Sequence, residues 1–359
     1  MYQKRKKYFT QLEKEFDGHV ISYITSDRAR FETQIAPDAI DLFIAHLDKI
    51  GIVNRILLFL YTRGGDTSAA WNIVNLVRMY CDELYVIIPH KAHSAGTIIS
   101  IGANKIIMTK QATLSPIDPS VTTPLNPVMN AGNVGQHSTL LPISVEAVNG
   151  YIELAKKEFL MDSPEQLQGA LSKLTDFVHP IVLGQAYRLR AQIRMFASKL
   201  LVHQIKDDDK ENAEEKTGKI TAFLCGDSGS HDYTINRREA KTELGLNVEI
   251  PTEEQYQIIK NLYDDFSTEL GFGQVFDPRY INGVFSIRRA FIESINGGSD
   301  YFVTEARVVP NVSQDGQNIF TFDLDFEGWR YESIIGDMPK NDNEQGGVFR
   351  YEATNEFGL

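Results

Sequence analysis

Two turns in the sequence combine small residues with groups that can do chemistry. Residues 63–66, Arg-Gly-Gly-Asp, follow the apolar run 55–62, and residues 92–96, Ala-His-Ser-Ala-Gly, follow the apolar run 84–89. The serine of the second turn, Ser94, stands where a strand gives way to a helix, which exposes its hydroxyl group near the positive end of that helix. Backbone N–H groups in such turns can stabilise the oxyanion of a tetrahedral intermediate, and paired glycines let the main chain approach a carbonyl group closely. Together the two turns predict nucleophilic attack on a carbonyl carbon.

The segments around these turns alternate between strand and helix patterns. Continuous apolar runs are typical of strands buried on both faces of a parallel sheet. Their alternation with helical spacing through residues 52–115 predicts βαβ crossovers, and hence an α/β fold. Both turns then fall beyond the carboxyl ends of strands, where open α/β sheets place their sites. The expected strands are residues 20–25, 55–62, 84–89 and 105–109, and the expected helices are residues 36–50 and 68–80.

The rest of the chain predicts helices first and strands later. Residues 1–16 have an amphipathic pattern and predict a peripheral helix, whereas residues 117–143 are rich in Pro, Asn, Gly, Ser and Thr and predict a long loop. After about residue 280 the pattern becomes β-like. The further expected helices are residues 145–157, 164–176, 184–205, 236–245 (capped by Asn236) and 252–269.

The order of these segments resembles the Clp-protease/crotonase superfamily, and within it the serine dehydrogenase proteinase branch, which is related to the signal peptide peptidase A group. Residues 62–66, 93–97 and 106–119 carry the likeness, which extends over about residues 20–260. The resemblance implies a stacked ββα spiral core with helical insertions and a smaller β-rich C-terminal region. It divides the chain into a hydrolase domain, residues 1–270, with an insertion at about 117–205, and a β-rich region of unknown role, residues 271–359.

The resemblance also implies roles for particular residues. Ser94 matches the nucleophile of the family, and the backbone N–H groups of Gly65 and Ala95 match its oxyanion donors. The segment near Gly64 and the loop 115–143 would lie beside an extended polypeptide substrate that binds by β-addition. The implied activity is that of a Clp-type serine endopeptidase that forms an acyl-enzyme on Ser94.

The general base departs from the family pattern. Clp proteases carry a histidine on the strand after the nucleophile helix, but residues 114–120 read Leu-Ser-Pro-Ile-Asp-Pro-Ser. The signal peptide peptidase branch takes a lysine from a later helix instead, and the start of the corresponding helix here has none. The base is therefore predicted at His231, with Asp118 or Asp232 as the orienting carboxylate. The remaining candidates are Lys156, Lys157, His137 and His93.

The composition limits the binding partners and the cellular compartment that we expect for this protein. The net charge of −12 argues against nucleic acid or an anionic membrane as the main partner. No stretch approaches the ~18 apolar residues that span a bilayer, and the two cysteines form no CxxC pair. We therefore expect a cytoplasmic, soluble protein without a metal site or cofactor. The chain has no P-loop, so any unfoldase or regulatory protein would be a separate partner. The family resemblance further implies a homo-oligomer.

Two other functions remain open on the sequence alone. A crotonase-type enzyme would bind an acyl-CoA thioester with the same pair of N–H donors and would need no serine nucleophile. A catalytically silent homologue would bind peptide or a partner protein, and the missing histidine within residues 114–120 keeps this reading open. The presence of Ser94 at the turn favours the peptidase.

Overall fold

We describe the protein from a computed structural model, which covers residues 2–129, 139–205, 210–227, 233–281, 283–312 and 318–332. The chain divides into two compact units. Of the described residues, those up to 118 and those from 191 onward form one unit, and residues 119–190 form the other.

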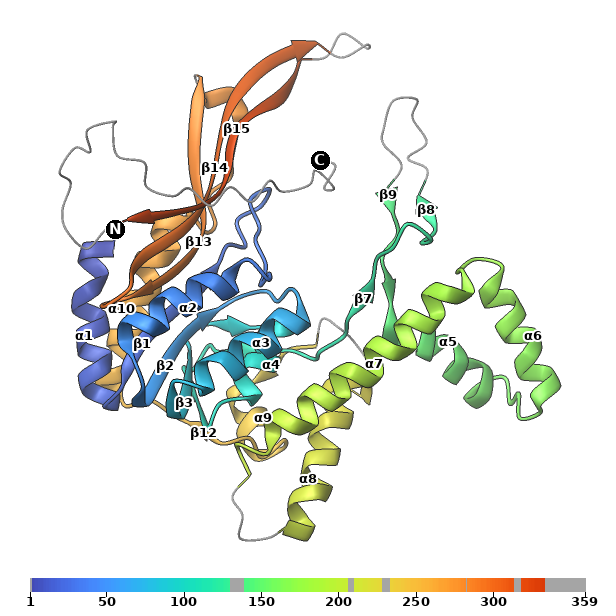
Figure 1. The fold of residues 1–359 in the computed structure, drawn as a ribbon. Coiled ribbons are helices and arrows are strands. Elements are labelled where there is room, and N and C mark those ends of the chain that lie inside the picture. Colours follow the sequence, from blue (N-terminus) through green and yellow to red (C-terminus); the bar gives the residue numbers. More distant parts are fainter. Residues whose placement is uncertain are drawn as a thin grey trace. The chain divides into compact units, whose positions relative to one another are not determined.

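An eight-stranded sheet forms the centre of the first unit (Figure 1). Its strand order is β12-β5-β3-β2-β1-β13-β14-β15, and the first five strands run parallel to one another. Helices connect most of these parallel strands along the chain, which confirms the predicted α/β fold. The parallel strands are β1 (His19–Thr25), β2 (Val53–Tyr61), β3 (Cys81–Ile88), β5 (Lys105–Met108) and β12 (Val248–Glu249).

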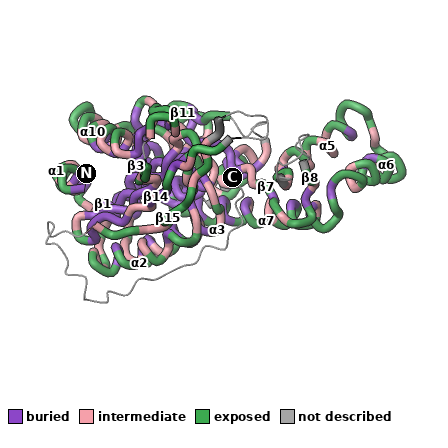
Figure 2. Tube along the Cα trace, turned by 90° about the horizontal axis from the view of Figure 1, so that it is seen from above, coloured by how far each residue is buried: buried purple, intermediate pink, exposed green. Residues whose placement is uncertain are grey.

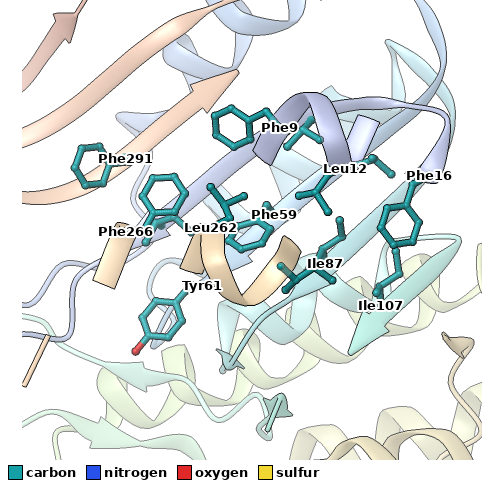
Figure 3. Close-up of a cluster of buried hydrophobic side chains, with 14 of the residues drawn as sticks. Phe9, Leu12, Phe16, Phe59, Tyr61, Ile87, Ile107, Leu262, Phe266 and Phe291 are labelled. Atoms are coloured by element: carbon teal, nitrogen blue, oxygen red, sulfur yellow. The ribbon is translucent and has the colours of Figure 1, made fainter. Parts of the chain in front are cut away.

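Helices cover both faces of the parallel strands, and the buried residues concentrate there (Figure 2). Helices α1 (Tyr2–Phe16) and α10 (Glu253–Leu270) cover one face, where Phe9, Phe59 and Phe266 join one hydrophobic cluster (Figure 3). Helix α2 (Ala39–Ile50) connects β1 to β2, and α3 (Thr67–Arg78) connects β2 to β3. Helix α4 (Ala95–Ile101) precedes β5 and packs against α3.

The first helix is not peripheral, contrary to the sequence prediction. Arg5 of α1 is fully buried and binds Glu293 and Asp265, with its guanidinium over the ring of Phe266. The sequence did not predict this burial, because Arg5 is charged and its carboxylate partners lie more than 250 residues away in sequence.

A second, smaller sheet is formed at the carboxyl ends of the parallel strands. Strand β4 (Lys91–Ala92) runs parallel to β6 (Thr113–Leu114), and β6 pairs antiparallel with β11 (Ile235–Asn236). A single bridge joins Thr62, just beyond β2, to Ala92 of β4. The nucleophile turn predicted from the sequence therefore lies between β4 and α4.

The C-terminal strands extend the main sheet. Strand β13 (Val284–Ser294) pairs antiparallel with β1, and β14 (Gly298–Val312) and β15 (Asn318–Glu332) follow as antiparallel neighbours (Figure 1). We call these three strands the C-terminal ribbon. The β-like character predicted after residue 280 is confirmed, while the domain boundary near residue 270 stays a prediction.

The second unit is built from short strands and helices around a small core. Val121, Ile143, Val178 and Val182 belong to this core. The described residues of the predicted loop 117–143 form only short strands within this unit and irregular segments between them. The elements here are β7 (Ser120–Val121), β8 (Val128–Met129), β9 (Thr139–Leu140), β10 (Ile143–Ser144), α5 (Val145–Lys157), α6 (Pro164–Thr175) and α7 (Pro180–Leu201), the last of which continues into residues of the first unit. Helices α8 (Lys210–Ala222) and α9 (Arg237–Thr242) return to the first unit, with the side chain of Asn236 capping α9 as predicted.

Candidate active site

Ser94 occupies a strained turn between β4 and α4. Its backbone has φ 50° and ψ −111°, a conformation that glycine adopts far more readily than residues with a Cβ atom. Its side chain is half-buried. Strain of this kind persists only where the surroundings enforce it, and it recurs at the nucleophile turns of hydrolases.

The two glycines of the first turn allow close packing because neither has a side chain: Gly64 lies against Ser94, and Gly65 lies against Ile35. A Cβ atom on Gly64 would lie 2.8 Å from the Cβ atom of Ser94. A Cβ atom on Gly65 would lie 2.2 Å from the carbonyl oxygen of Ile35. Both glycines also have positive φ, 122° and 142°. Close approach and backbone conformation therefore both require glycine at these positions.

Two backbone N–H groups near Ser94 are free to bind a ligand oxygen. Ile35 pairs with the turn through the bonds Ile35 N–H to Gly64 O and Asp66 N–H to Ile35 O, both 2.8 Å, which leave the N–H of Gly65 unused. Ala95 is the first residue of α4, so its N–H has no partner within the helix. Neither N–H meets an acceptor within the described part of the chain.

A network of buried hydroxyl groups, which the sequence analysis missed, holds the Ser94 turn in place. The N–H of Ser94 donates to the Oγ of Ser115 at 2.8 Å. Thr97 Oγ1 donates to Ser115 O at 2.7 Å and to Ala92 O at 3.1 Å. Ser115 and Thr97 are both buried. Ser115 belongs to the segment 114–120, which lacks the family histidine, and its hydroxyl group is the sequence signal for this network.

The structure brings only some of the predicted catalytic residues to this site. Asp118 follows Ile117 shortly after β6, in the same unit as Ser94, and its carboxylate is half-buried. His93 is engaged by Thr113, whose Oγ1 lies 2.9 Å from its Nε2. Within the described residues, no side chain forms a hydrogen bond with the Oγ of Ser94.

The other candidate bases belong to the second unit or fall outside the described residues. His231, Asp232 and His137 fall outside the described residues. Lys156 and Lys157 end helix α5 in the second unit, where Lys157 forms an ion pair with Glu153.

The described residues that flank the His231 segment are fixed beside Ser115. The N–H of Ile117 donates to the carbonyl oxygen of Leu224 at 2.7 Å on one side of the segment. On the other side, Ile235 of β11 pairs with Leu114 of β6. Leu224 and Ile235 thus contact residues 117 and 114, which lie on either side of Ser115 in the sequence. The hydroxyl group of Ser115 is the one that binds the N–H of Ser94.

A second arrangement of serine, histidine and aspartate is present, but it is sealed. His46 Nδ1 lies 2.7 Å from Ser294 Oγ, and His46 Nε2 lies 3.0 Å from Asp300 Oδ2. All three residues are buried, and the backbone of Gly297 covers the imidazole so closely that a Cβ atom there would lie 1.9 Å from Nδ1. This cluster fastens α2 to the β13–β14 turn and offers no space for a substrate.

The segment that holds the glycine turn and the Ser94 turn matches a known protein family. Residues 52–134 match the ClpP-like SDH-type serine proteinase family. The predicted resemblance to the serine dehydrogenase proteinase branch is confirmed over this segment, which contains Gly64, Gly65, Ser94 and Ala95.

Two curated relatives come from Methanocaldococcus jannaschii. Uncharacterized protein MJ0137 is 30% identical over 207 residues, and uncharacterized protein MJ1495 is 24% identical over 206 residues. Each match covers 57% of this chain. The chain spans 57% and 56% of the lengths of the two relatives.

Solved proteases resemble the chain more distantly. The 1510-N membrane-bound stomatin-specific protease is 14% identical with a TM-score of 0.34, over 71% of this chain and 87% of the protease chain. ClpP1 from Listeria monocytogenes is 13% identical with a TM-score of 0.34, over 68% of this chain and 99% of its own. The fold class therefore rests on the strand order described above. Among the described helices, none is both long enough and apolar enough to cross a bilayer.

Proposed function

We propose that the protein is a serine peptidase that cleaves extended polypeptide through an acyl-enzyme on Ser94. The observation that carries the proposal is the strained Ser94 turn beside Gly64 and Gly65. In the first step the Oγ of Ser94 attacks the peptide carbonyl carbon, its proton passes to a base, and the tetrahedral intermediate expels the amine with a proton. Water then hydrolyses the ester and frees Ser94.

The N–H groups of Gly65 and Ala95 would stabilise the oxyanion in both steps. Each is a donor without an acceptor among the described residues. The N–H of Ser94 is a weaker candidate because Ser115 already accepts it. Loss of one oxyanion donor typically lowers the rate by about 10²–10³.

His231 remains our choice for the base, with Asp118 or Asp232 as the carboxylate that orients it. The anchoring of Leu224 and Ile235 beside Ile117 and Leu114 supports this choice. A carboxylate that accepts from one imidazole nitrogen would fix the tautomer that receives the proton of Ser94. Lys156, Lys157 and His137 are the rival bases.

The substrate would lie as an added strand along Gly64 and the loop that follows Ser115. Main-chain bonds would supply affinity, and pockets for alternate side chains would supply specificity. A substrate bound through its backbone must be extended, so folded proteins would require a separate unfoldase.

Homo-oligomerisation in the cytoplasm is part of the proposal. The second unit exposes large apolar side chains, including Phe159, which follows α5, Phe177, which follows α6, and Tyr187 of α7, and these favour this unit as an interface. Cys81 and Cys225 are not joined in a disulfide, which fits a reducing compartment. Light scattering should give a mass that is a multiple of the 40.5 kDa chain, and a monomer at micromolar concentration would contradict this part.

Labelling by a fluorophosphonate tests the proposed function directly. The reagent phosphonylates an activated serine, so mass spectrometry should find one adduct per chain, on Ser94. The Ser94→Ala variant should remain unlabelled. An acyl-CoA enzyme or a silent homologue would show no adduct in the wild type, and that result would refute the peptidase.

A further inference from the structure

The C-terminal ribbon grips a loop that leads to the active site. This loop, residues 26–35, follows β1, and we call it the connecting loop. Arg289 of β13 donates from Nη2 to the carbonyl oxygen of Glu32 at 2.5 Å and from Nε to that of Phe31 at 3.4 Å. Its Nη1 binds Glu327 of β15 at 2.7 Å. One guanidinium thus joins the connecting loop to the ribbon.

The backbone of Arg289 holds the same loop a second time. Its carbonyl oxygen accepts from the N–H of Ser26 at 2.8 Å and from Thr33 Oγ1 at 2.6 Å. Thr33 Oγ1 also accepts from the N–H of Ser26, and Thr33 N–H donates to Ser26 O. The two ends of the loop are therefore closed on each other and on β13.

A ring cluster adds an apolar contact to these bonds. Phe31 is buried, and its ring meets Phe276 and Phe285 edge to face, with centroids 4.8 and 5.8 Å apart. Because Phe285 belongs to β13, the connecting loop is packed on the ribbon as well as hydrogen-bonded to it.

The far end of the connecting loop is Ile35, which pairs with the glycine turn. Ile35 uses its own N–H and carbonyl group to hold Gly64 and Asp66, and its backbone closely contacts Gly65. An ion pair between Arg63 and Glu32 spans the same gap at 3.8 Å. Arg289 therefore holds Thr33, and two residues further along the chain Ile35 holds the backbone of the glycine turn on both sides of Gly65.

We infer that Arg289 is a positioning residue, and that the C-terminal ribbon serves the active site by holding the glycine turn in place through the connecting loop. The inference rests on the proposed function, because Gly65 matters to catalysis only as an oxyanion donor. It gives residues 284–332 a role in the reaction without any contact with the substrate.

The expected effect is on the rate of acylation. A displacement of about 1 Å at a reacting centre can cost about 10²-fold, and removal of Arg289 would free the loop without removing the donor itself. We therefore expect a loss of about 10–100-fold in kcat and in the rate of phosphonylation of Ser94. The KM for a peptide should change less than kcat, because the loop that follows Ser115 would still bind the substrate backbone, whereas the oxyanion depends on the exact position of the Gly65 N–H.

The experiment compares Arg289→Ala with Arg330→Ala in the full-length protein. Arg330 is the matched control, since it also lies on the ribbon and pairs with a carboxylate, Glu305, at 2.6 Å, but has no bond to the connecting loop. Arg330→Ala should label at the wild-type rate, and Arg289→Lys, which can restore a single charged donor, should recover part of the loss. Equal losses in Arg289→Ala and Arg330→Ala, or wild-type kcat in a folded Arg289→Ala, would overturn the inference.

A milder variant decides the matter where Arg289→Ala does not fold. Thr33→Val has nearly the same shape and removes only the bond from Thr33 Oγ1 to Arg289 O and its acceptance of Ser26 N–H. It should slow acylation about tenfold, whereas Thr321→Val, which loses a ribbon hydroxyl bond to Val309 O, should not. Unchanged acylation in Thr33→Val would count against the inference.

Hydrogen exchange separates this inference from the proposed function. The N–H of Asp66 is protected by Ile35 O, so peptides covering residues 60–70 should exchange faster in Arg289→Ala than in the wild type or Arg330→Ala. If the fluorophosphonate does not label the wild type, the peptidase is refuted. The exchange of residues 60–70 still tests whether Arg289 holds the glycine turn. Unchanged exchange in a labelled protein would refute only the positioning role.

Discussion

The N–H of Ser94 donates to the Oγ of Ser115, a buried hydroxyl group 2.8 Å away and 21 residues later in the chain. Ser115 in turn donates to the carbonyl oxygen of Pro116 at 3.1 Å. The bond from Ser94 N–H to Ser115 holds the strained backbone of Ser94 in place and occupies this N–H group. In the proposed mechanism this leaves the N–H groups of Gly65 and Ala95 as the donors to the oxyanion.

Replacement of Ser115 should therefore damage catalysis more than folding. In Ser115→Ala the N–H of Ser94 loses its acceptor, which should cost about 1–3 kcal/mol of unfolding free energy and at least tenfold in phosphonylation rate. Ser100→Ala is the control, because Ser100 is also buried and its hydroxyl group donates within α4, to Gly96 O. Comparable labelling rates in the two variants would show that Ser115 does not position the nucleophile. Urea unfolding and labelling kinetics measure both effects.

Ser94 should stabilise the protein less than glycine would. A residue with a Cβ atom at this backbone conformation costs about 1–3 kcal/mol, and glycine gives back part of that gain in chain entropy. We expect Ser94→Gly to unfold with a free energy about 1 kcal/mol higher than Ser94→Ala, with both variants unlabelled. A Ser94→Gly variant that is less stable than Ser94→Ala in urea would show that the turn is not strained.

Gly65→Ala should abolish activity. Its Cβ atom would lie 2.2 Å from Ile35 O and 2.5 Å from Ile35 N, so the pairing with the connecting loop must break. The N–H of residue 65 would move, and turnover should fall by at least about 100-fold. Gly169→Ala, in an open position of α6, should keep wild-type turnover and gain about 0.5–1 kcal/mol. Peptide hydrolysis and thermal melts test the pair.

Asp27 should make the stability depend on pH in the acid range. Burial alone would raise the pKa of Asp27, but hydrogen bonds from Lys91 at 2.6 Å and Tyr61 at 2.8 Å lower it below its ordinary value. A lowered native pKa stabilises the fold above the unfolded pKa of about 3.9, and this contribution is lost as pH falls through the native value.

The matching variant is Asp27→Asn, which should cost about 1–3 kcal/mol at pH 5–7. The deficit against wild type should shrink as the pH falls below about 4. Asp264→Asn, which removes an exposed partner of Lys260, should cost much less. A deficit for Asp27→Asn that does not change between pH 6 and pH 3 in urea titrations would rule out this linkage.

The pH profile of acylation should identify the base. If His231 takes the proton of Ser94, the rate should fall as pH drops through about 6–7, because the protonated imidazole cannot accept it. A lysine base would place the limb near pH 8–9. His231→Ala should lose about 10²–10⁴ in rate, and a folded variant within tenfold of wild type would exclude His231.

Local sequence patterns determined the elements and the two turns. Apolar runs at strand length and apolar spacing at helix length predicted the parallel strands, and glycine and serine types marked Gly65 and Ser94. These features depend on residues within a few positions of each other, so the chain itself displays them. Asn236 as a helix cap is a further example.

The tertiary structure decided which distant groups meet. Nothing near Arg5 in the sequence indicates a buried cation, because Glu293 and Asp265 come from strands and helices at the other end of the chain. Ser115 is the partner of Ser94 only because β6 pairs with β4 in the folded chain. The link from Arg289 to Ile35 likewise exists only because β13 pairs with β1, so that a ribbon some 260 residues later supports the loop after the first strand. Hydrogen bonds and close packing act over a few ångströms of space, and only the fold converts separation along the chain into that proximity.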